Sequence, residues 1–172
     1  ATPFTSPISG NTLCIGSPLQ LSHPTSGGTW SIPATTGLSI SNTGVLTGTV
    51  STTASSVVVS YDYTINACSF TDTKTINISQ LIAGTATGNE TLCANVTPSA
   101  ITLAGNTVGS TIQWQSSSDN VTFSNIANAT AASLSPGSIS ATTYYRAVVT
   151  NGACSSAYSS VDTIKVDPAS IG

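Results

Sequence analysis

Four cysteines and one histidine are the residues of this sequence whose side chains could do redox or metal chemistry. Cys14, Cys68, Cys93 and Cys154 are widely spaced, and no Cys-x-x-Cys motif occurs. With His23 as the single histidine, set in the turn-like stretch LSHPTSG, neither a zinc site nor a thioredoxin-like motif is indicated, and we expect His23 at the surface. The even number of cysteines favours disulfides, which form in an oxidising compartment.

The rest of the sequence holds no pattern typical of an active site. There is no G-x-S-x-G elbow for a nucleophilic serine and no glycine loop for phosphate. The six acidic residues are scattered, and Asp119 in SSSDNVTF lacks the further acids that a calcium loop needs. We therefore expect a protein that is not an enzyme and that uses no cofactor and no metal.

The shortage of charge excludes two classes of partner. Only 5% of the residues are charged, the formal net charge is −3, and three residues are basic. Such a chain cannot neutralise several phosphates, so nucleic-acid binding is excluded. No apolar run approaches the roughly 20 residues of a membrane span, so we expect no direct membrane insertion. Serine and threonine supply 58 residues, which predicts a hydroxyl-rich surface.

A cysteine-bearing phrase occurs twice, as SGNTLC at residues 9–14 and as TGNETLC at residues 87–93. Each half continues with a tryptophan and a second cysteine, Trp30 and Cys68 in one, Trp114 and Cys154 in the other. The ends also match, TINISQLIAG with TIKVDPASIG. A unit of about 80–90 residues predicts two tandem domains, 1–82 and 83–172. Because the last residues resemble the junction between the halves, we expect a piece of a longer array.

Alternating apolar and polar residues predict the strands that position these side chains. One face of SVVVSYDYTINAC carries Val57, Val59, Tyr61, Tyr63 and Ile65. In TTYYRAVVTNGAC, Tyr145, Ala147 and Val149 share one face and Arg146 lies on the other. Turn-forming clusters such as SNTG and AGNTVG separate the runs, and no helical period is evident. The fold class is therefore all-β, with two tandem antiparallel β-sandwiches in Greek-key topology.

The tryptophans and cysteines each allow two interpretations. Trp30 and Trp114 recur at equivalent positions, which favours core residues between the sheets over platforms that stack on sugars. Repeat symmetry favours the disulfides Cys14–Cys68 and Cys93–Cys154, which would act as staples within the units. A bond between Cys68 and Cys93 across the junction is the alternative.

The stretch WQSSSDNVTFSNIANATAASLSP, followed by TTYYRAVVTNGACSSAYSSVDTIKV, resembles the Ig-like (PKD-like) tandem repeats of large Bacteroidota proteins. These include gliding-motility adhesins and other type IX-secreted proteins of the cell surface. IPATTGLSISNTGVLTGTV is similar to a signature of Ig domains in bacterial surface proteins. The resemblance implies an Ig-like sandwich in an extracellular or cell-surface setting. In that setting the tripeptide DTI, which resembles a bacterial O-glycosylation motif, makes Thr163 a possible glycan site, although an ordinary strand is the better explanation of so short a motif.

These observations predict a structural and adhesive repeat segment of a secreted bacterial surface adhesin or filament, with neighbouring repeats or subunits as partners. One alternative is a filament subunit that adds the segment ATPFTSPIS to the sheet of a neighbour. Another is a carbohydrate-binding module attached to a secreted hydrolase. That module would bind a surface polysaccharide through the exposed aromatic side chains of Phe70, Tyr144 and Tyr158.

Overall fold

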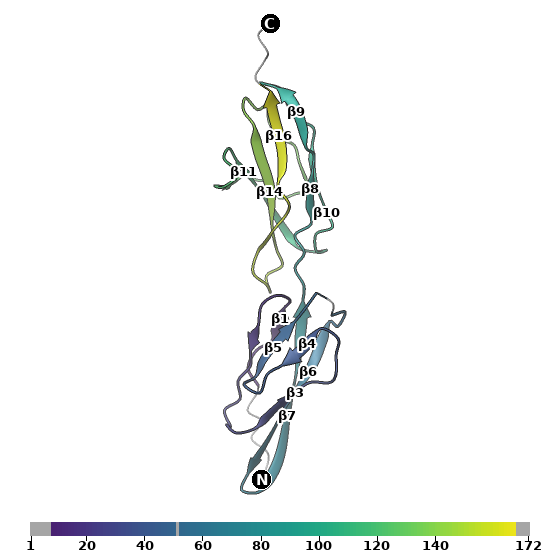
Figure 1. Cartoon of the computed structure of the whole chain (residues 1–172), viewed down its shortest axis with the longest axis vertical. Helices are drawn as coiled ribbons and strands as arrows, with labels where there is room; N and C mark the ends of the chain where they lie inside the picture. The colour runs from purple at the N-terminus through teal and green to yellow at the C-terminus, as the bar shows by residue number, and fades with distance from the viewer. Residues whose placement is uncertain (1–7, 51, 168–172) are drawn as a thin grey trace. The chain divides into compact units, whose positions relative to one another are not determined.

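Strands are the only regular elements in the part of the chain that the computed structural model describes, residues 8–50 and 52–167 (Figure 1). Valine, isoleucine and threonine are frequent in the sequence, and their branched side chains fit a pleated, half-buried surface. Within these residues no helix has the length and hydropathy that a membrane crossing requires. The predicted all-β fold class is confirmed.

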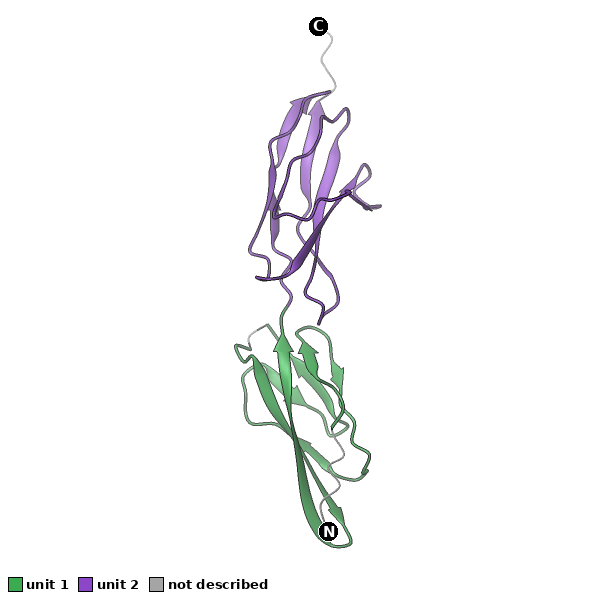
Figure 2. Ribbon diagram, turned by 180° about the vertical axis from the view of Figure 1, so that it is seen from behind, with its two compact units in different colours: residues 1–80 green, residues 81–172 purple. Residues whose placement is uncertain are grey.

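The chain divides into two compact units, unit 1 at Ala1–Gln80 and unit 2 at Leu81–Gly172 (Figure 2). The sequence repeat places this boundary after residue 82, two residues further along the chain. Each unit has a hydrophobic core of its own. The two units are therefore described one at a time.

Unit 1 packs a four-stranded sheet on a three-stranded sheet. The larger sheet has the order β1-β7-β6-β3, in which β1 is parallel to β7 and the other pairs are antiparallel. The smaller sheet has the order β2-β5-β4. The strands are β1 (Thr12–Cys14), β2 (Leu19–Gln20), β3 (Thr29–Ser31), β4 (Leu38–Ile40), β5 (Val45–Gly48), β6 (Ser56–Ile65) and β7 (Cys68–Ser79).

Unit 2 has the same two-layer plan with a wider main sheet. That sheet has the order β12-β11-β14-β16-β9, and β15 also pairs with β14. The second sheet has the order β13-β10-β8. The strands are β8 (Thr85–Thr87), β9 (Glu90–Cys93), β10 (Ile101–Ala104), β11 (Thr111–Ser117), β12 (Ser124–Asn125), β13 (Ser133–Leu134), β14 (Thr143–Thr150), β15 (Ala157–Tyr158) and β16 (Asp162–Asp167).

The repeated phrase forms the same strand in both units. In unit 1 it becomes β1, which pairs in parallel with the last strand so that Cys14 lies opposite Ser79. In unit 2 it becomes β9, which pairs in parallel with the last strand so that Cys93 lies opposite Asp167. Cys14 and Cys93 therefore mark the same structural position, at the end of a parallel edge strand.

The core of unit 1 confirms the predicted alternation along β6 up to the end of the sandwich. Val57, Val59, Tyr61 and Tyr63 are buried, with exposed fractions of 6% or less. Ile65, two residues further on the same face, is 46% exposed. It lies at the tip of the β6–β7 hairpin, paired with Cys68, and β3 already ends its pairing at Asp62. The alternation therefore continues beyond the point where the second sheet covers the strand.

The two tryptophans differ in depth. Trp114 is fully buried at the centre of the core of unit 2, and its indole Nε1–H donates to Ala131 O at 2.9 Å. Trp30 is partly buried at the margin of the core of unit 1, where its ring lies 4.5 Å from that of Tyr61. Gly44, with φ of +81°, lies against the Trp30 indole, and a Cβ there would come within 2.8 Å of Nε1.

Asp162 is a carboxylic acid inside the core of unit 2. It precedes Ile164 on the inward face of β16 and is fully buried, and neither carboxylate oxygen has a hydrogen-bond partner among the described residues. Burial raises the pKa of Asp162; the nearby backbone N–H groups of Asn89 and Gly88 lower it less, since neither meets the geometry of a hydrogen bond to the carboxylate. The charged form of Asp162 therefore destabilises the fold.

Replacing Asp162 by asparagine removes the ionisable group and keeps the size of the side chain. Because the pKa is raised above its ordinary value of about 3.9, the stability that the protonated acid contributes is present below that pH and is lost as the pH rises through the folded pKa. We expect the Tm of D162N relative to wild type to be higher at pH 7 than at pH 4. The gain should be a few degrees, since roughly 4–8 °C corresponds to 1 kcal/mol in a domain of this size.

Thermal unfolding followed by circular dichroism at both pH values measures this difference. D167N, which changes the exposed acid at the end of the same strand, is the matched control. A Tm difference for D162N that does not change with pH would contradict the role given to the buried charge.

Candidate functional site

The outer face of the main sheet of unit 2 gathers aromatic and polar side chains. Along β14, Tyr145, Ala147 and Val149 are buried, so Tyr144 and Arg146 lie on the opposite, outward face. Register places Gln115 of β11 opposite Arg146. The local alternation of β14 thus carries the single arginine of the chain to the surface of a sheet.

Arg146 is held between two aromatic rings on this face. Its guanidinium carbon lies 3.9 Å from the ring centre of Phe123 and 4.2 Å from that of Tyr158. Arg146 Nε–H donates to Gln115 Oε1 at 2.9 Å, and Gln115 Nε2–H donates to Asn125 Oδ1 at 2.9 Å. We call these five residues the Arg146 cluster. Stacking and hydrogen bonding together fix the plane of the guanidinium.

The charge of the Arg146 cluster is not balanced by an acid. In residues 8–50 and 52–167 the one contact within ion-pair distance joins His23 to Asp72, in unit 1, and the histidine is charged there only when it is protonated. Tyr158 is 55% exposed, so one side of the cluster opens to solvent. A guanidinium stays protonated at physiological pH and cannot serve as an acid or base, but its remaining N–H groups can bind an acceptor such as a carboxylate. The arrangement therefore fits binding rather than catalysis.

The sequence-predicted aromatic residues divide between the two units. Tyr158 belongs to the Arg146 cluster, and Tyr144 lies two residues from Arg146 on the same face of β14. Phe70 lies in unit 1, stacked on Tyr63 with a distance of 5.6 Å between ring centres. No row of all three therefore forms within one unit. Sequence reasoning missed Phe123 and Arg146, because only the strand register brings them to Tyr158.

His23, expected at the surface, has a side chain that is 1% exposed. Its ring lies 4.4 Å from that of Tyr61 and 4.9 Å from that of Tyr63. Thr25 N–H donates to Nδ1 at 3.1 Å, so the proton of the neutral ring sits on Nε2, 2.9 Å from Asp72 Oδ2. The expectation was wrong because the turn folds its histidine inward over the end of the aromatic core.

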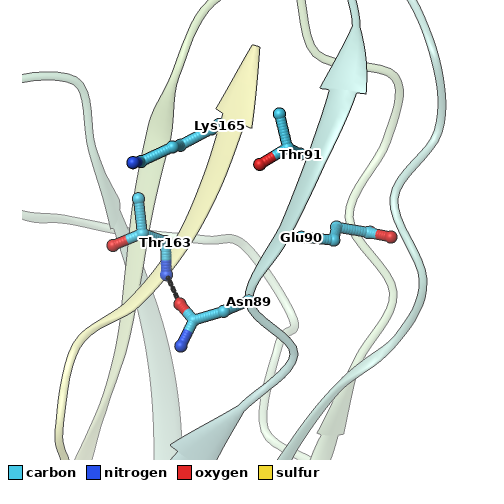
Figure 3. Close-up of a pocket in the computed structure, with 5 residues that line it drawn as sticks. All are labelled: Asn89, Glu90, Thr91, Thr163 and Lys165. Atoms are coloured by element: carbon cyan, nitrogen blue, oxygen red, sulfur yellow. Dashed lines mark hydrogen bonds between the residues drawn. The ribbon is translucent and has the colours of Figure 1, made fainter. Parts of the chain in front are cut away.

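Thr163, the possible glycan site, lines a shallow pocket on β9 and β16 (Figure 3). Its backbone N–H donates to Asn89 Oδ1 at 2.6 Å. Asp162 and Ile164 on either side are buried, so the Thr163 side chain lies on the outer face. The other lining residues are Asn89, Glu90, Thr91 and Lys165. A glycan on this hydroxyl stays a prediction.

The two disulfides predicted within the repeats do not form. Cys68 and Cys93 are free, exposed thiols, whereas Cys14 and Cys154 are disulfide-bonded. In unit 1, Cys14 lies opposite Ser79 at the last residue of β7, and Cys68 is the first residue of that strand. Eleven residue steps of about 3.3 Å separate the two by roughly 36 Å, far beyond the 4.4–6.8 Å between the Cα atoms of a disulfide.

The cysteines of unit 2 are separated in the same way. Cys93 lies opposite Asp167, at the end of the sheet where β14 begins. Cys154 follows the other end of β14, in the loop between Thr150 and β15. The intervening length of sheet is about 30 Å, so this pair cannot bond either. The alternative bond between Cys68 and Cys93 is absent as well, since both thiols are free.

Comparison with known proteins identifies a family for the second half of the chain and similar folds among solved structures. Residues 82–168 match the family model described as "Domain of unknown function (DUF8696)". No curated protein sequence matches the chain. The chain is similar to extracellular domains 3–5 of Drosophila OTK, with 13% identity, a TM-score of 0.55 and coverage of 94% of this chain and 60% of that one.

A second similar structure is the I-band fragment I67–I69 of titin, with 12% identity, a TM-score of 0.46 and coverage of 92% of this chain and 63% of that one. The chain thus spans less than two thirds of the length of either structure. The predicted Ig-like β-sandwich fold is confirmed by the likeness to OTK together with the sheet topology of each unit.

Alkylation of the native chain without reductant should modify two cysteines, because the free thiols of Cys68 and Cys93 are both exposed. Denaturation alone should add none, and reduction should then release Cys14 and Cys154. Peptide mapping by mass spectrometry after iodoacetamide treatment measures this at dilute protein concentration. A native chain in which no cysteine reacts would contradict the free, exposed state of Cys68 and Cys93.

Proposed function

From the premise that the chain belongs, through residues 82–168, to the family described as "Domain of unknown function (DUF8696)", we propose that it is a structural and adhesive repeat segment of a secreted bacterial surface protein. The proposed role is mechanical and non-enzymatic. Each unit is a stiff β-sandwich that holds its neighbours apart and presents its sheet faces to the surroundings.

The observation that carries this proposal is the structural repeat. Both units place the cysteine-bearing edge strand in parallel beside the last strand of the main sheet. Two units with the same construction in one chain are typical of tandem arrays, in which each small domain folds around its own core. The resemblance of the second half to Ig-like repeats of Bacteroidota adhesins and type IX-secreted proteins supports the same role.

The chemistry of the chain supports an extracellular setting. Cys14 and Cys154 are disulfide-bonded, and disulfides persist in oxidising compartments. With 5% charged residues and 58 serines and threonines, the polar surface is mainly hydroxyl and amide. Hydration of such a surface changes little with ionic strength, because few charges are screened. A protein exposed to variable salt outside the cell benefits from that property.

A filament subunit that polymerises by strand addition is a variant of this proposal. The segment assigned to that role, ATPFTSPIS, lies largely outside the described residues. The variant differs from the leading proposal in the size of the native protein.

Immunoblotting with an antibody against this segment tests the proposal on source cells. We expect a band of much higher mass than the 17.2 kDa of this chain on a reducing denaturing gel, and loss of that band when intact cells are treated with protease. A band near 17 kDa would favour the filament subunit. A band that protease removes only after lysis would contradict an extracellular role.

A second candidate function, binding of a carboxylate-bearing surface polysaccharide, rests on the Arg146 cluster. Among the described residues the guanidinium has no acidic partner, its plane is fixed, and Tyr158 offers an exposed ring on which a sugar can stack. This combination fits a uronate residue, whose carboxylate accepts hydrogen bonds while its ring packs on the aromatic face.

Affinity electrophoresis in gels that contain polygalacturonate or dextran tests this candidate. We expect retardation by the acidic polymer only, and roughly fivefold weaker binding for Y158A and R146K, since each loses an interaction of about 1 kcal/mol. V108S changes a residue that is 98% exposed and serves as the control. Equal retardation of wild type, R146K and Y158A would exclude the cluster as the binding site.

A further inference from the structure

The four cysteines occupy two structural positions, each used once per unit. Cys14 and Cys93 end the edge strand that pairs in parallel with the last strand, and we call them strand-end cysteines. Cys68 and Cys154 follow the strand that pairs antiparallel with the last strand of the main sheet, β6 in unit 1 and β14 in unit 2, and we call them hairpin cysteines. Each unit therefore carries one of each type, at opposite ends of its main sheet.

At each of the two positions, the cysteine of one unit is disulfide-bonded and the cysteine of the other unit is a free thiol. Of the strand-end pair, Cys14 is disulfide-bonded and Cys93 is free. Of the hairpin pair, Cys154 is disulfide-bonded and Cys68 is free. Both positions are thus shown to support a disulfide in this fold. The two free thiols are exposed, so no packing prevents them from reacting in the same way.

The partner of each free thiol must lie outside its own unit. Roughly 36 Å of strand separates Cys68 from the strand-end position of unit 1, and about 30 Å separates Cys93 from the hairpin position of unit 2. These lengths follow from β7 and from the register of β9, β14 and β16. Each free thiol is too far from the other cysteine of its own unit, while the equivalent cysteine of the other unit forms a disulfide. We therefore look for its partner in a neighbouring unit.

Exposed apolar side chains flank both free thiols. Ile65, the residue opposite Cys68 in the hairpin, is 46% exposed. Val96, three residues after Cys93, is 40% exposed. A contact that buries these side chains would bring the two ends together before any covalent bond forms. The thiols therefore sit in surfaces suited to docking.

We propose that Cys93 of one copy of this chain forms a disulfide with Cys68 of the next copy, so that strand-end and hairpin cysteines join successive units head to tail. Both S–H bonds break and one S–S bond forms. Two electrons and two protons pass to an oxidant, a thiol–disulfide oxidoreductase in the oxidised state or oxidised glutathione in the laboratory. The proposal rests on the tandem-array function, in which a second copy of this chain takes the place of the next repeat, and it names the cysteines that join successive repeats.

Two single variants test the pairing between types. C68S retains only the Cys93 thiol, and C93S retains only the Cys68 thiol. Equimolar variants, one of them labelled with nitrogen-15, are mixed with oxidised glutathione at high protein concentration. Mass spectrometry then counts mixed dimers against dimers of each variant alone. Random pairing makes mixed dimers about half of the total, whereas we expect at least a roughly fivefold excess of mixed dimers over all others.

A control thiol separates docking from simple exposure. V108C in the C68S/C93S background carries one free thiol, which lies away from both the strand-end and the hairpin position. This thiol is exposed, because Val108 is 98% exposed in the loop before β11. Mixed with C93S, it should give random pairing. Random pairing between C68S and C93S, or no dimer at all, would overturn the proposal. Neither result changes the outcome of the immunoblot on intact cells. The disulfide proposal can therefore fail while the array function stands, and the two experiments distinguish the two failures.

Discussion

The parallel pairing of the first cysteine-bearing strand with the last strand determines what holds each unit together. It places the strand-end cysteine at one end of the main sheet and leaves the hairpin cysteine at the other. No disulfide can then close within a unit, so each sandwich depends on its apolar core for stability. The core of each unit contains fully buried apolar side chains: Trp114, Ile101 and Ile164 in unit 2, and Leu13, Leu46 and Val59 in unit 1.

The interiors of the two units handle polar groups differently. In unit 1 the ring of His23 packs against the rings of both Tyr61 and Tyr63, and Asp72 accepts hydrogen bonds from His23 and Tyr63. Burial, with the nearby Asp72 carboxylate, raises the pKa of Tyr63. In unit 2, Asp162 is buried with no such partner. A satisfied polar network specifies a core, whereas an unsatisfied acid weakens it as soon as it ionises.

Periodicity predicted from the sequence the features that depend on one strand alone. The inward faces of β6 and β14 and the all-β class follow from alternation, because side chains on a strand must point to opposite sides. Alternation does not reveal where a covering sheet ends, so Ile65 was misplaced. The repeat revealed the equivalence of the cysteines, but symmetry carries no distances, and the strand length that separates Cys14 from Cys68 becomes visible only in the register.

The Arg146 cluster and the cysteines lie on different parts of the sandwich, so binding of a ligand and bonding between units would use different surfaces. Arg146 lies on the outer face of β14, whereas the strand-end and hairpin cysteines lie at the two ends of the sheet. Among the described residues the one contact within ion-pair distance joins His23 to Asp72 inside unit 1, and 5% of all residues are charged, so salt bridges contribute little to the proposed link between copies. Covalent bonds and exposed apolar side chains at the ends can form that link without charge. The proposed disulfide link would leave the sheet faces open to other partners, and its strength would not depend on salt.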